Sequence, residues 1–313
     1  MPTTADAYSQ LLSPAMQAFV QQSETLSQTQ TDSLSAQRTA YQRVYEHFYA
    51  GRPAGVRVIN TQVPTPQHNI PIRHYWPAQA PLGQVLYLHG GGFVLGNLDS
   101  HDDICAELCA KAQMHITAVD YRLAPEHPYP AAFEDALACY QHVSSSPHKW
   151  PLFLAGDSAG ANLAAAVAHT SRQLPQQAQG LLLIYPWLGC RYTQSSFSTH
   201  ANAPGLIIQM LKLFQKHYQG TQSLPTTTSF APLQDKDFSH LPPVRAFAAQ
   251  CDPLVDEAVD YCQAVQLAGG DAHCHLEKGL IHSYLRARHH VPEAGASFER
   301  IVRVLRDLSR SRL

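Results

Sequence analysis

The segment Gly156–Gly160, with the sequence GDSAG, constrains the fold of this chain more than any other feature. The apolar residues 152–155 before it are typical of a buried strand, and the Ala- and Leu-rich residues 161–169 after it favour a helix. A strand, a G-x-S-x-G turn and a helix together form a nucleophile elbow, in which a strained turn exposes the serine hydroxyl. Small residues are needed around the serine because the strand and helix backbones come close together there. The pattern predicts a reactive serine at Ser158.

The composition is that of a globular enzyme. The chain has 313 residues, of which 45% are hydrophobic and 15% charged, and this suffices for one large core with a small cap. It carries 22 basic and 24 acidic residues with no basic block, so we expect no nucleic-acid partner. The seven cysteines form no CxxC pair, which favours reduced, buried thiols.

The sequence gives no signal for export or for membrane insertion. The first ten residues lack a basic segment followed by an apolar one. The longest apolar stretch, Leu181–Leu188, is broken by Pro186 and is too short to span a bilayer. We therefore expect a cytoplasmic protein without stable membrane insertion, and a homodimer is possible.

Short apolar strands alternate with helices from about residue 56 onwards. This alternation predicts an α/β fold with a mostly parallel eight-stranded sheet that is flanked by helices and carries a helical cap. The expected strands are 56–60, 70–76, 84–89, 116–120, 152–155, 181–185, 244–250 and 272–277. The expected helices besides the elbow helix are 100–113, 131–143, 257–267 and 293–308.

Two segments lie outside this alternation and predict the cap. Residues 1–50 contain two apolar helical faces, and the Gln-, Ser- and Thr-rich residues 21–37 between them predict a mobile connection. The long insertion after strand 181–185 contains an apolar helical pattern and is expected to act as a lid. The predicted domains are N-terminal cap helices at 1–50, a first core part at 51–188, a cap insertion at 189–240 and a second core part at 241–313.

Ser158 needs a base to take its proton, and the base needs an acid that orients it. In elbow-type enzymes these follow the serine in the order acid, then histidine. Asp252 comes just after a predicted strand, where ligands gather at the carboxyl end of a parallel sheet, so we predict that it is the acid. An Asx turn ahead of Pro253 is its alternative role. Asp256 and Glu257 are interpreted instead as first-turn residues of the next helix, where the helix dipole favours acids.

His282 is the predicted base, because it stands in a loop directly after the last predicted strand. His273 and His275 fall inside that strand and are expected to face solvent or the covering of the sheet. They could be interpreted as metal ligands, but the sequence offers no third ligand at suitable spacing, so no metal is expected.

His89–Gly92, with the sequence HGGG, follows another predicted strand. Bare glycine backbone lets N–H groups approach a substrate oxygen closely, and we predict that Gly91, Gly92 and Ala159 form an oxyanion hole. A flexible glycine turn is the alternative. His89 itself is expected to shape the loop by hydrogen bonding.

Several further motifs accompany these residues. They are HGGGF at His89–Phe93, DYRLAPEHPYPAAFED at Asp120–Asp135, GDSAGANLA at Gly156–Ala164, DPLVDE at Asp252–Glu257 and IHSY at Ile281–Tyr284. With them the chain resembles the hormone-sensitive lipase-like (bacterial type IV, GDXG) carboxylesterases of the α/β-hydrolase fold, over residues from about 84 to 290. Ala161 and Ser283 stand where that family often has glycine, but neither position carries a catalytic group.

The resemblance implies a cap built from the N-terminus and the insertion, hydrolysis of short acyl esters, and no cofactor. Glu126 is expected to be a buried carboxylate near the site with a structural role. The substrate pocket is expected to include Phe93, Trp187, Leu188, Leu206 and Ile207.

Two other functions stay open on the same fold. The same three groups could serve an amidase or a peptidase, because the chemistry of acyl transfer is shared. A non-catalytic small-molecule receptor resembling the plant gibberellin receptors, which have lost the histidine, is the alternative from another class.

Overall fold

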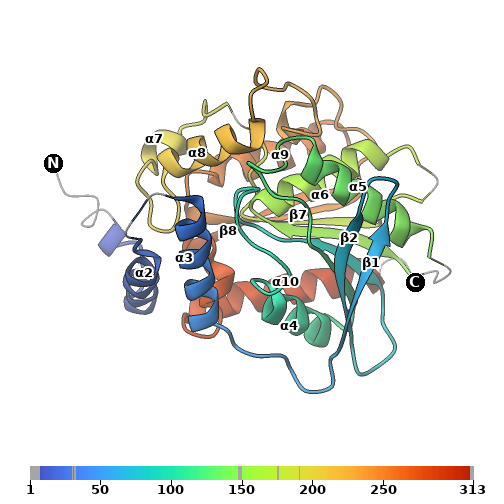
Figure 1. Ribbon diagram of the computed structural model, residues 1–313, viewed down its shortest axis with the longest axis horizontal. Coiled ribbons are helices and arrows are strands. Elements are labelled where there is room, and N and C mark those ends of the chain that lie inside the picture. The colour runs from blue at the N-terminus through green and yellow to red at the C-terminus, as the bar shows by residue number, and fades with distance from the viewer. Residues whose placement is uncertain are drawn as a thin grey trace.

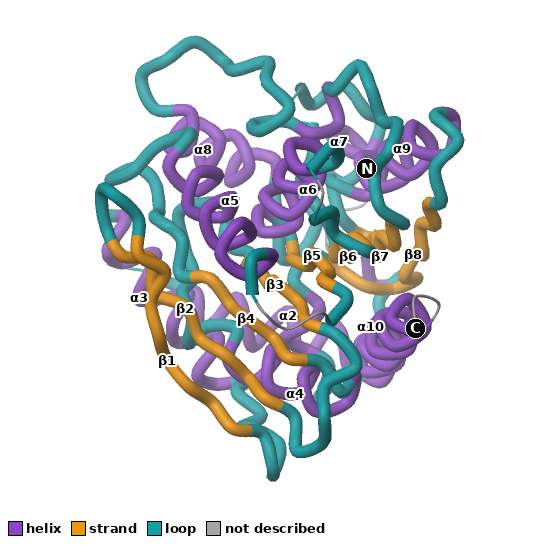
Figure 2. The backbone as a smooth tube through the Cα atoms, turned by 90° about the vertical axis from the view of Figure 1, so that its right-hand side faces the viewer, coloured by secondary structure: helices purple, strands orange, loops and turns teal. Residues whose placement is uncertain are grey.

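An eight-stranded sheet forms the centre of the computed structural model, which describes residues 8–29, 31, 33–146, 150–174, 176–189 and 191–310. The strand order is β1-β2-β4-β3-β5-β6-β7-β8. Figure 1 shows β1 and β2 at one end of the sheet and β8 at the other, and Figure 2 labels all the strands in this order. The strands are β1 Arg57–Pro64, β2 Asn69–Trp76, β3 Gln84–Leu88, β4 His115–Val119, β5 Leu152–Asp157, β6 Gly180–Ile184, β7 Val244–Cys251 and β8 Ala272–Ile281. The pairs β1–β2 and β2–β4 are antiparallel, and the remaining neighbours are parallel.

Helices cover both faces of this sheet. The helices α5 (Ala131–Ser144) and α6 (Ala159–Ser171) lie on one face, and α4 (Asp102–Ala112) and α10 (Pro292–Arg310) lie on the other (Figure 2). Every residue of β3, β4, β5 and β6 is buried, as expected of parallel strands that are covered on both sides. The α/β-hydrolase fold expected from the sequence is confirmed.

The last strand differs from its predicted bounds in a way that matters for the site. It was expected to end near residue 277, but β8 continues past a bulge to Ile281, where Ile281 pairs with Cys251. The backbone N–H of Gly279 donates to the Gln250 side chain at 2.9 Å and bridges the irregular stretch. His282 therefore follows the end of a strand directly and does not sit within a longer loop.

The two segments that were predicted to form the cap both contain helices, and the N-terminal one contains α2 (Pro14–Ser27) and α3 (Leu34–His47). The insertion contains α7 (Ser196–Thr199), α8 (Ile208–Gln219) and the short 3₁₀ helix η1 (Pro232–Gln234). Figure 1 shows α3 running beside the core, with α7 and α8 near its upper end.

The expected long connection between the two N-terminal helices is wrong for most of its length. Residues 21–27 continue α2, and residues 34–37 belong to α3. Ser13 and Ser33 cap the two helices by accepting from Met16 N and Ala36 N. Polar side chains need no apolar partner on the exposed face of a helix, so a Gln- and Ser-rich stretch can still be helical.

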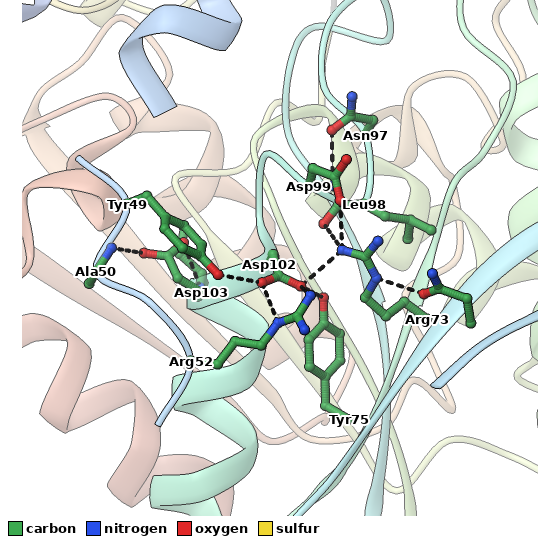
Figure 3. Close-up of polar contacts among 12 residues, drawn as sticks. Tyr49, Ala50, Arg52, Arg73, Tyr75, Asn97, Leu98, Asp99, Asp102 and Asp103 are labelled. Carbon is green, nitrogen blue, oxygen red and sulfur yellow. Dashed lines mark hydrogen bonds and ion pairs between the residues drawn. The ribbon is translucent and has the colours of Figure 1, made fainter. Parts of the chain in front are cut away.

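The chain between the cap and the core is fixed by a buried carboxylate at the start of α4 (Figure 3). Asp102 accepts from Arg52 Nε at 2.7 Å, from Arg73 Nη1 and the Tyr49 hydroxyl at 2.9 Å, and from the Tyr75 hydroxyl at 3.0 Å. Burial by itself raises the pKa of Asp102, but Arg52, Tyr49 and Tyr75 lower it below its ordinary value. The segment after α3 is thereby tied to β2 and α4.

The described residues contain no helix that is both long and apolar enough to cross a bilayer. Six cysteines are described as free thiols, and all but Cys274 are buried.

A buried histidine on α6 links this helix to Asp235 and to a later helix of the chain. His169 Nδ1 lies 2.7 Å from Asp235 Oδ2, and its Nε2 lies 2.9 Å from the Tyr261 hydroxyl on α9 (Val255–Leu267). Burial lowers the pKa of His169 to about 4, although Asp235 acts in the opposite direction. The folded protein therefore keeps this imidazole neutral at pH values where the unfolded chain begins to take up a proton.

We predict that His169 makes the folded state less stable as the pH falls from 6.5 toward 4. Between these values the unfolded state binds more protons than the folded state, so the free energy of unfolding falls by roughly 1.4 kcal/mol per pH unit for this group. Urea unfolding at pH 6.5 and pH 5 should therefore show a drop that is about 2 kcal/mol smaller in His169→Gln than in the wild type. The exposed His273→Gln should keep the wild-type drop. Equal drops in His169→Gln and the wild type would contradict this assignment.

Candidate active site

Ser158 stands at a strained turn between β5 and α6. Its φ of +54° and ψ of −119° lie outside the regions that most residues with side chains occupy. The close approach of the two backbones leaves no room for side chains nearby. A Cβ on Gly160 would lie 2.0 Å from the carbonyl oxygen of Leu88, and one on Gly156 would lie 2.5 Å from Gly160. The sequence therefore produces the elbow expected from its glycines.

The structure brings Ser158, His282 and Asp252 together. His282 Nε2 lies 2.9 Å from Ser158 Oγ, and His282 Nδ1 lies 2.7 Å from Asp252 Oδ2. The second oxygen of Asp252 accepts the N–H of Leu254 at 2.9 Å. Asp252 follows β7 and His282 follows β8, so both side chains reach the carboxyl edge of the sheet where Ser158 stands. All three residues are buried.

These contacts define a direction for proton transfer. The Asp252 carboxylate can only accept, so the Nδ1 of His282 carries the hydrogen of that bond. The unprotonated Nε2 can then accept the hydrogen of the Ser158 hydroxyl. The arrangement can activate a serine as a nucleophile without a metal or a cofactor.

The glycine loop follows β3 and lies beside the serine. Gly91 and Gly92 have φ values of +130° and +62°, and both line the cavity that contains Ser158. A Cβ on Gly91 would lie 2.2 Å from the carbonyl oxygen of Leu95, and one on Gly92 would lie 2.4 Å from the Phe214 ring. Only glycine fits at these positions without a shift of the loop or the cap.

Ala159, the third predicted donor, is the first residue of α6. Its N–H belongs to the first turn of the helix, where backbone N–H groups have no partner within the helix. The positive end of the helix dipole also favours a developing negative charge there.

His89 supports the glycine loop, as expected. Its Nδ1 lies 2.9 Å from the Gly90 carbonyl oxygen, and its ring stacks on Tyr121 with the centroids 4.3 Å apart. Burial lowers the pKa of His89 to about 3, so the ring is neutral near pH 7.

Asp157, the residue before the serine, holds the glycine loop in place, and sequence reasoning passed over it. Its carboxylate accepts from the Gly90 N–H at 3.0 Å and from the Tyr87 hydroxyl at 2.9 Å. Burial alone raises the pKa of Asp157, but His101 and Tyr87 lower it to about 2. An acidic residue inside an otherwise apolar buried strand was the available signal, because a buried charge needs dedicated partners.

A cavity of about 110 Å³ opens beside Ser158 and His282. Of the predicted substrate-binding residues, Trp187 and Leu206 line it. The other three, Phe93, Leu188 and Ile207, do not, which corrects the sequence-based expectation.

Each of these three side chains is directed elsewhere by its packing. Phe93 has a φ of +63° and stacks on Tyr218, with the ring centroids 3.7 Å apart. Leu188 is fully buried in the core, and its N–H donates to Glu257 at 2.5 Å. Ile207 is partly exposed and lines a second, outer groove.

The outer groove has a volume of about 520 Å³ and lies between α2 and the loop before α8. Gly205, Leu206 and Met210 line both the groove and the inner cavity. These three residues therefore form the partition between the two spaces.

Glu126 is not the buried carboxylate that was expected. Its side chain is 51% exposed and forms a bidentate ion pair with Arg38 of α3, with N–O distances of 2.7 and 2.8 Å. Arg38 also donates to the carbonyl oxygens of Val94 and Ala124. The pair has the expected structural role, but it links the cap to the glycine loop from the surface.

Comparisons with known proteins agree with this geometry. A family model described as alpha/beta hydrolase fold matches residues 85–286. Esterase LipI of Mycobacterium tuberculosis is 35% identical over 80% of this chain and 82% of its own length. The ethyl acetate hydrolase of Pseudomonas putida is 31% identical over 76% of this chain and 78% of its own length. A solved esterase of Pyrobaculum calidifontis superposes with a TM-score of 0.85 at 29% identity, over 95% of this chain and 99% of that one.

The family match covers more than half of the chain, and both relatives cover more than two thirds of it. The chain therefore belongs to the α/β-hydrolase fold family, and its matched relatives are esterases.

Proposed function

We propose that this chain is a serine carboxylesterase that hydrolyses short- to medium-chain acyl esters through an acyl-enzyme intermediate. The observation that carries the proposal is the pair of hydrogen bonds that joins Ser158 to His282 and His282 to Asp252. The named activities of LipI and of the ethyl acetate hydrolase support a small-molecule ester as the substrate. A cytoplasmic location and a homodimer stay predictions.

In the proposed mechanism, His282 Nε2 takes the proton of Ser158 as the serine oxygen bonds to the ester carbonyl carbon. The carbonyl oxygen becomes an oxyanion and accepts from the backbone N–H groups of Gly91, Gly92 and Ala159. Asp252 holds the tautomer of His282 and stabilises the imidazolium. The bond to the alcohol oxygen then breaks, and the alcohol leaves with the proton from His282.

Water completes the cycle by the same route. His282 takes a proton from the water as its oxygen attacks the acyl carbon, and a second oxyanion forms at the same donors. When this intermediate collapses, the bond to Ser158 breaks and the serine oxygen regains its proton from His282. The products are the carboxylic acid and the free enzyme.

We predict that Ser158→Ala lowers ester turnover by at least about a thousandfold, because no other group supplies the nucleophile. His282→Ala and the double variant should lose about as much as Ser158→Ala, since the pair acts as a unit. The measurement is the release of p-nitrophenol from p-nitrophenyl butanoate, with an unfolding curve for each variant. The exposed Ser198→Ala serves as the control and should keep wild-type turnover. Residual activity within tenfold of the wild type, or additive losses in the double variant, would sink the assignment.

The proposed chain-length preference follows from the partition between the inner cavity and the outer groove. Each buried methylene contributes about 0.8 kcal/mol, or about fourfold in kcat/KM, until the inner cavity is full. We therefore expect kcat/KM to rise over a few carbons and then to fall, with an optimum between acetyl and hexanoyl esters. The family resemblance further implies poor activity beyond about ten carbons.

Leu206→Ala should open the partition and move the optimum toward longer acyl chains by two or more carbons. The matched control is Leu213→Ala on α8, which is partly exposed and lines neither space. The measurement is kcat/KM for a series of p-nitrophenyl esters from acetyl to dodecanoyl. An unchanged optimum in Leu206→Ala would show that Leu206 does not limit the chain.

A further inference from the structure

The inner cavity is lined by two kinds of side chain. The apolar lining consists of Leu95, Ile104, Trp187, Leu206, Met210, Leu211 and Phe214. The polar lining, besides Ser158 and His282, includes Tyr41, His101, Asp157, Tyr185, Ser283 and Arg286. The mechanism proposed above uses none of these further polar side chains.

Arg286 is the most unusual residue of the polar lining. It lies on the 3₁₀ helix η2 (Tyr284–Ala287), four residues after His282, and only 8% of it is exposed. Its guanidinium lies over the Tyr41 ring, 4.6 Å from the centroid, and Nη1 donates to the Ser100 carbonyl oxygen at 3.4 Å. Nη2 is buried without a hydrogen-bond partner among the described residues.

The charge of Arg286 has no direct ion pair in the described part of the chain. Burial by itself lowers the pKa of Arg286, but Tyr41, Tyr185 and Asp157 raise it above its ordinary value, so the group stays charged. The Asp157 carboxylate offsets part of this charge, while its own oxygens accept from Gly90 and Tyr87. The Arg286 side chain is also hydrogen-bonded to Tyr41, so Nη2 is the nitrogen that lacks an acceptor.

A buried donor without an acceptor is costly, and such groups in native proteins call for a specific explanation. Here the unpartnered nitrogen belongs to a side chain that lines the same cavity as Ser158 and His282. A bound oxygen acceptor would satisfy it. A neutral oxygen fits better than a carboxylate, because Asp157 already supplies a negative charge nearby.

An ester has an acyl part and an alcohol part, and either one could contact Arg286. The acyl chain and the alcohol leave the scissile carbonyl in different directions. The proposed function places the acyl chain against the apolar lining next to Leu206, which leaves the polar lining for the alcohol.

We propose that Arg286 is a specificity-determining residue that donates to a neutral oxygen on the alcohol part of the ester. The preferred substrates are then esters of short alcohols that carry an ether, hydroxyl or carbonyl oxygen near the ester bond. This proposal rests on the proposed esterase function and on its placement of the acyl chain. The contact forms on binding and persists in the transition state, so its loss should appear mainly in KM.

The test compares 2-methoxyethyl acetate with butyl acetate, which differ by the replacement of one methylene with an ether oxygen. The ratio of kcat/KM for the ether ester to kcat/KM for the butyl ester should fall about tenfold or more in Arg286→Met, mainly through KM. Methionine keeps an unbranched apolar stem against Tyr41. Arg286→Lys should recover part of the ratio. Arg245→Met, which removes a guanidinium paired with Asp271 outside the cavity, should leave the ratio unchanged.

Three outcomes would overturn the proposal. Equal losses on both acetates would show that Arg286 has only a structural role. An unchanged ratio would show that it does not contact the alcohol. A loss that appears with ethyl methoxyacetate against ethyl butanoate, and not with the acetates, would place the oxygen on the acyl side.

A second measurement covers the case in which Arg286→Met does not fold. The wild-type enzyme should be inhibited competitively by 2-methoxyethanol at a lower concentration than by 1-butanol, and equal or weaker inhibition by the ether would overturn the proposal. Failure of the esterase function itself is distinguishable, because then neither acetate would be hydrolysed and Ser158→Ala would change nothing.

Discussion

The contact between the start of α6 and the end of β3 is the constraint on which the site depends. The backbone at Gly160 approaches the Leu88 carbonyl so closely that a Cβ would lie 2.0 Å away. This approach forces the turn that presents Ser158 to the inner cavity, and the glycine loop begins immediately after Leu88. Asp157 strengthens the same contact by accepting the Gly90 N–H. The distance between the nucleophile and the predicted oxyanion donors is thus set by the packing of main chains, which is stiffer than that of side chains.

Two polar contacts connect the predicted cap to this core, and one of them is exposed while the other is buried. Arg38 joins α3 to the carbonyl oxygen of Val94, two residues beyond the glycine loop, and to the exposed Glu126. The buried Asp102 carboxylate binds Arg52, which lies in the segment that follows α3. An exposed ion pair adds little to stability, whereas a buried carboxylate that loses its donors is strongly destabilising. The Asp102 cluster therefore fixes where the cap joins the core, and Arg38 aligns the cap with the loop.

Most of the fold could be predicted from the sequence, and so could the grouping of Ser158, His282 and Asp252 at the site. The central strands could be predicted because buried parallel strands are continuously apolar. Asp252 and His282 could be predicted because each follows a strand that the sequence pattern indicated. The direction of Phe93 could not be predicted, since it depends on a positive φ that a hydrophobic pattern does not encode. The burial of Arg286 was equally hidden, because it arises from packing against Tyr41, which lies 245 residues earlier in the chain.

The most direct test of the central claim is covalent labelling of the nucleophile. Diethyl p-nitrophenyl phosphate should transfer its diethylphosphoryl group to the Ser158 oxygen as p-nitrophenolate leaves. Mass spectrometry of the intact protein and of its peptides should then show one added group per chain, located on Ser158, in step with the loss of esterase activity. Labelling at another residue, or loss of activity without a label on Ser158, would contradict the account.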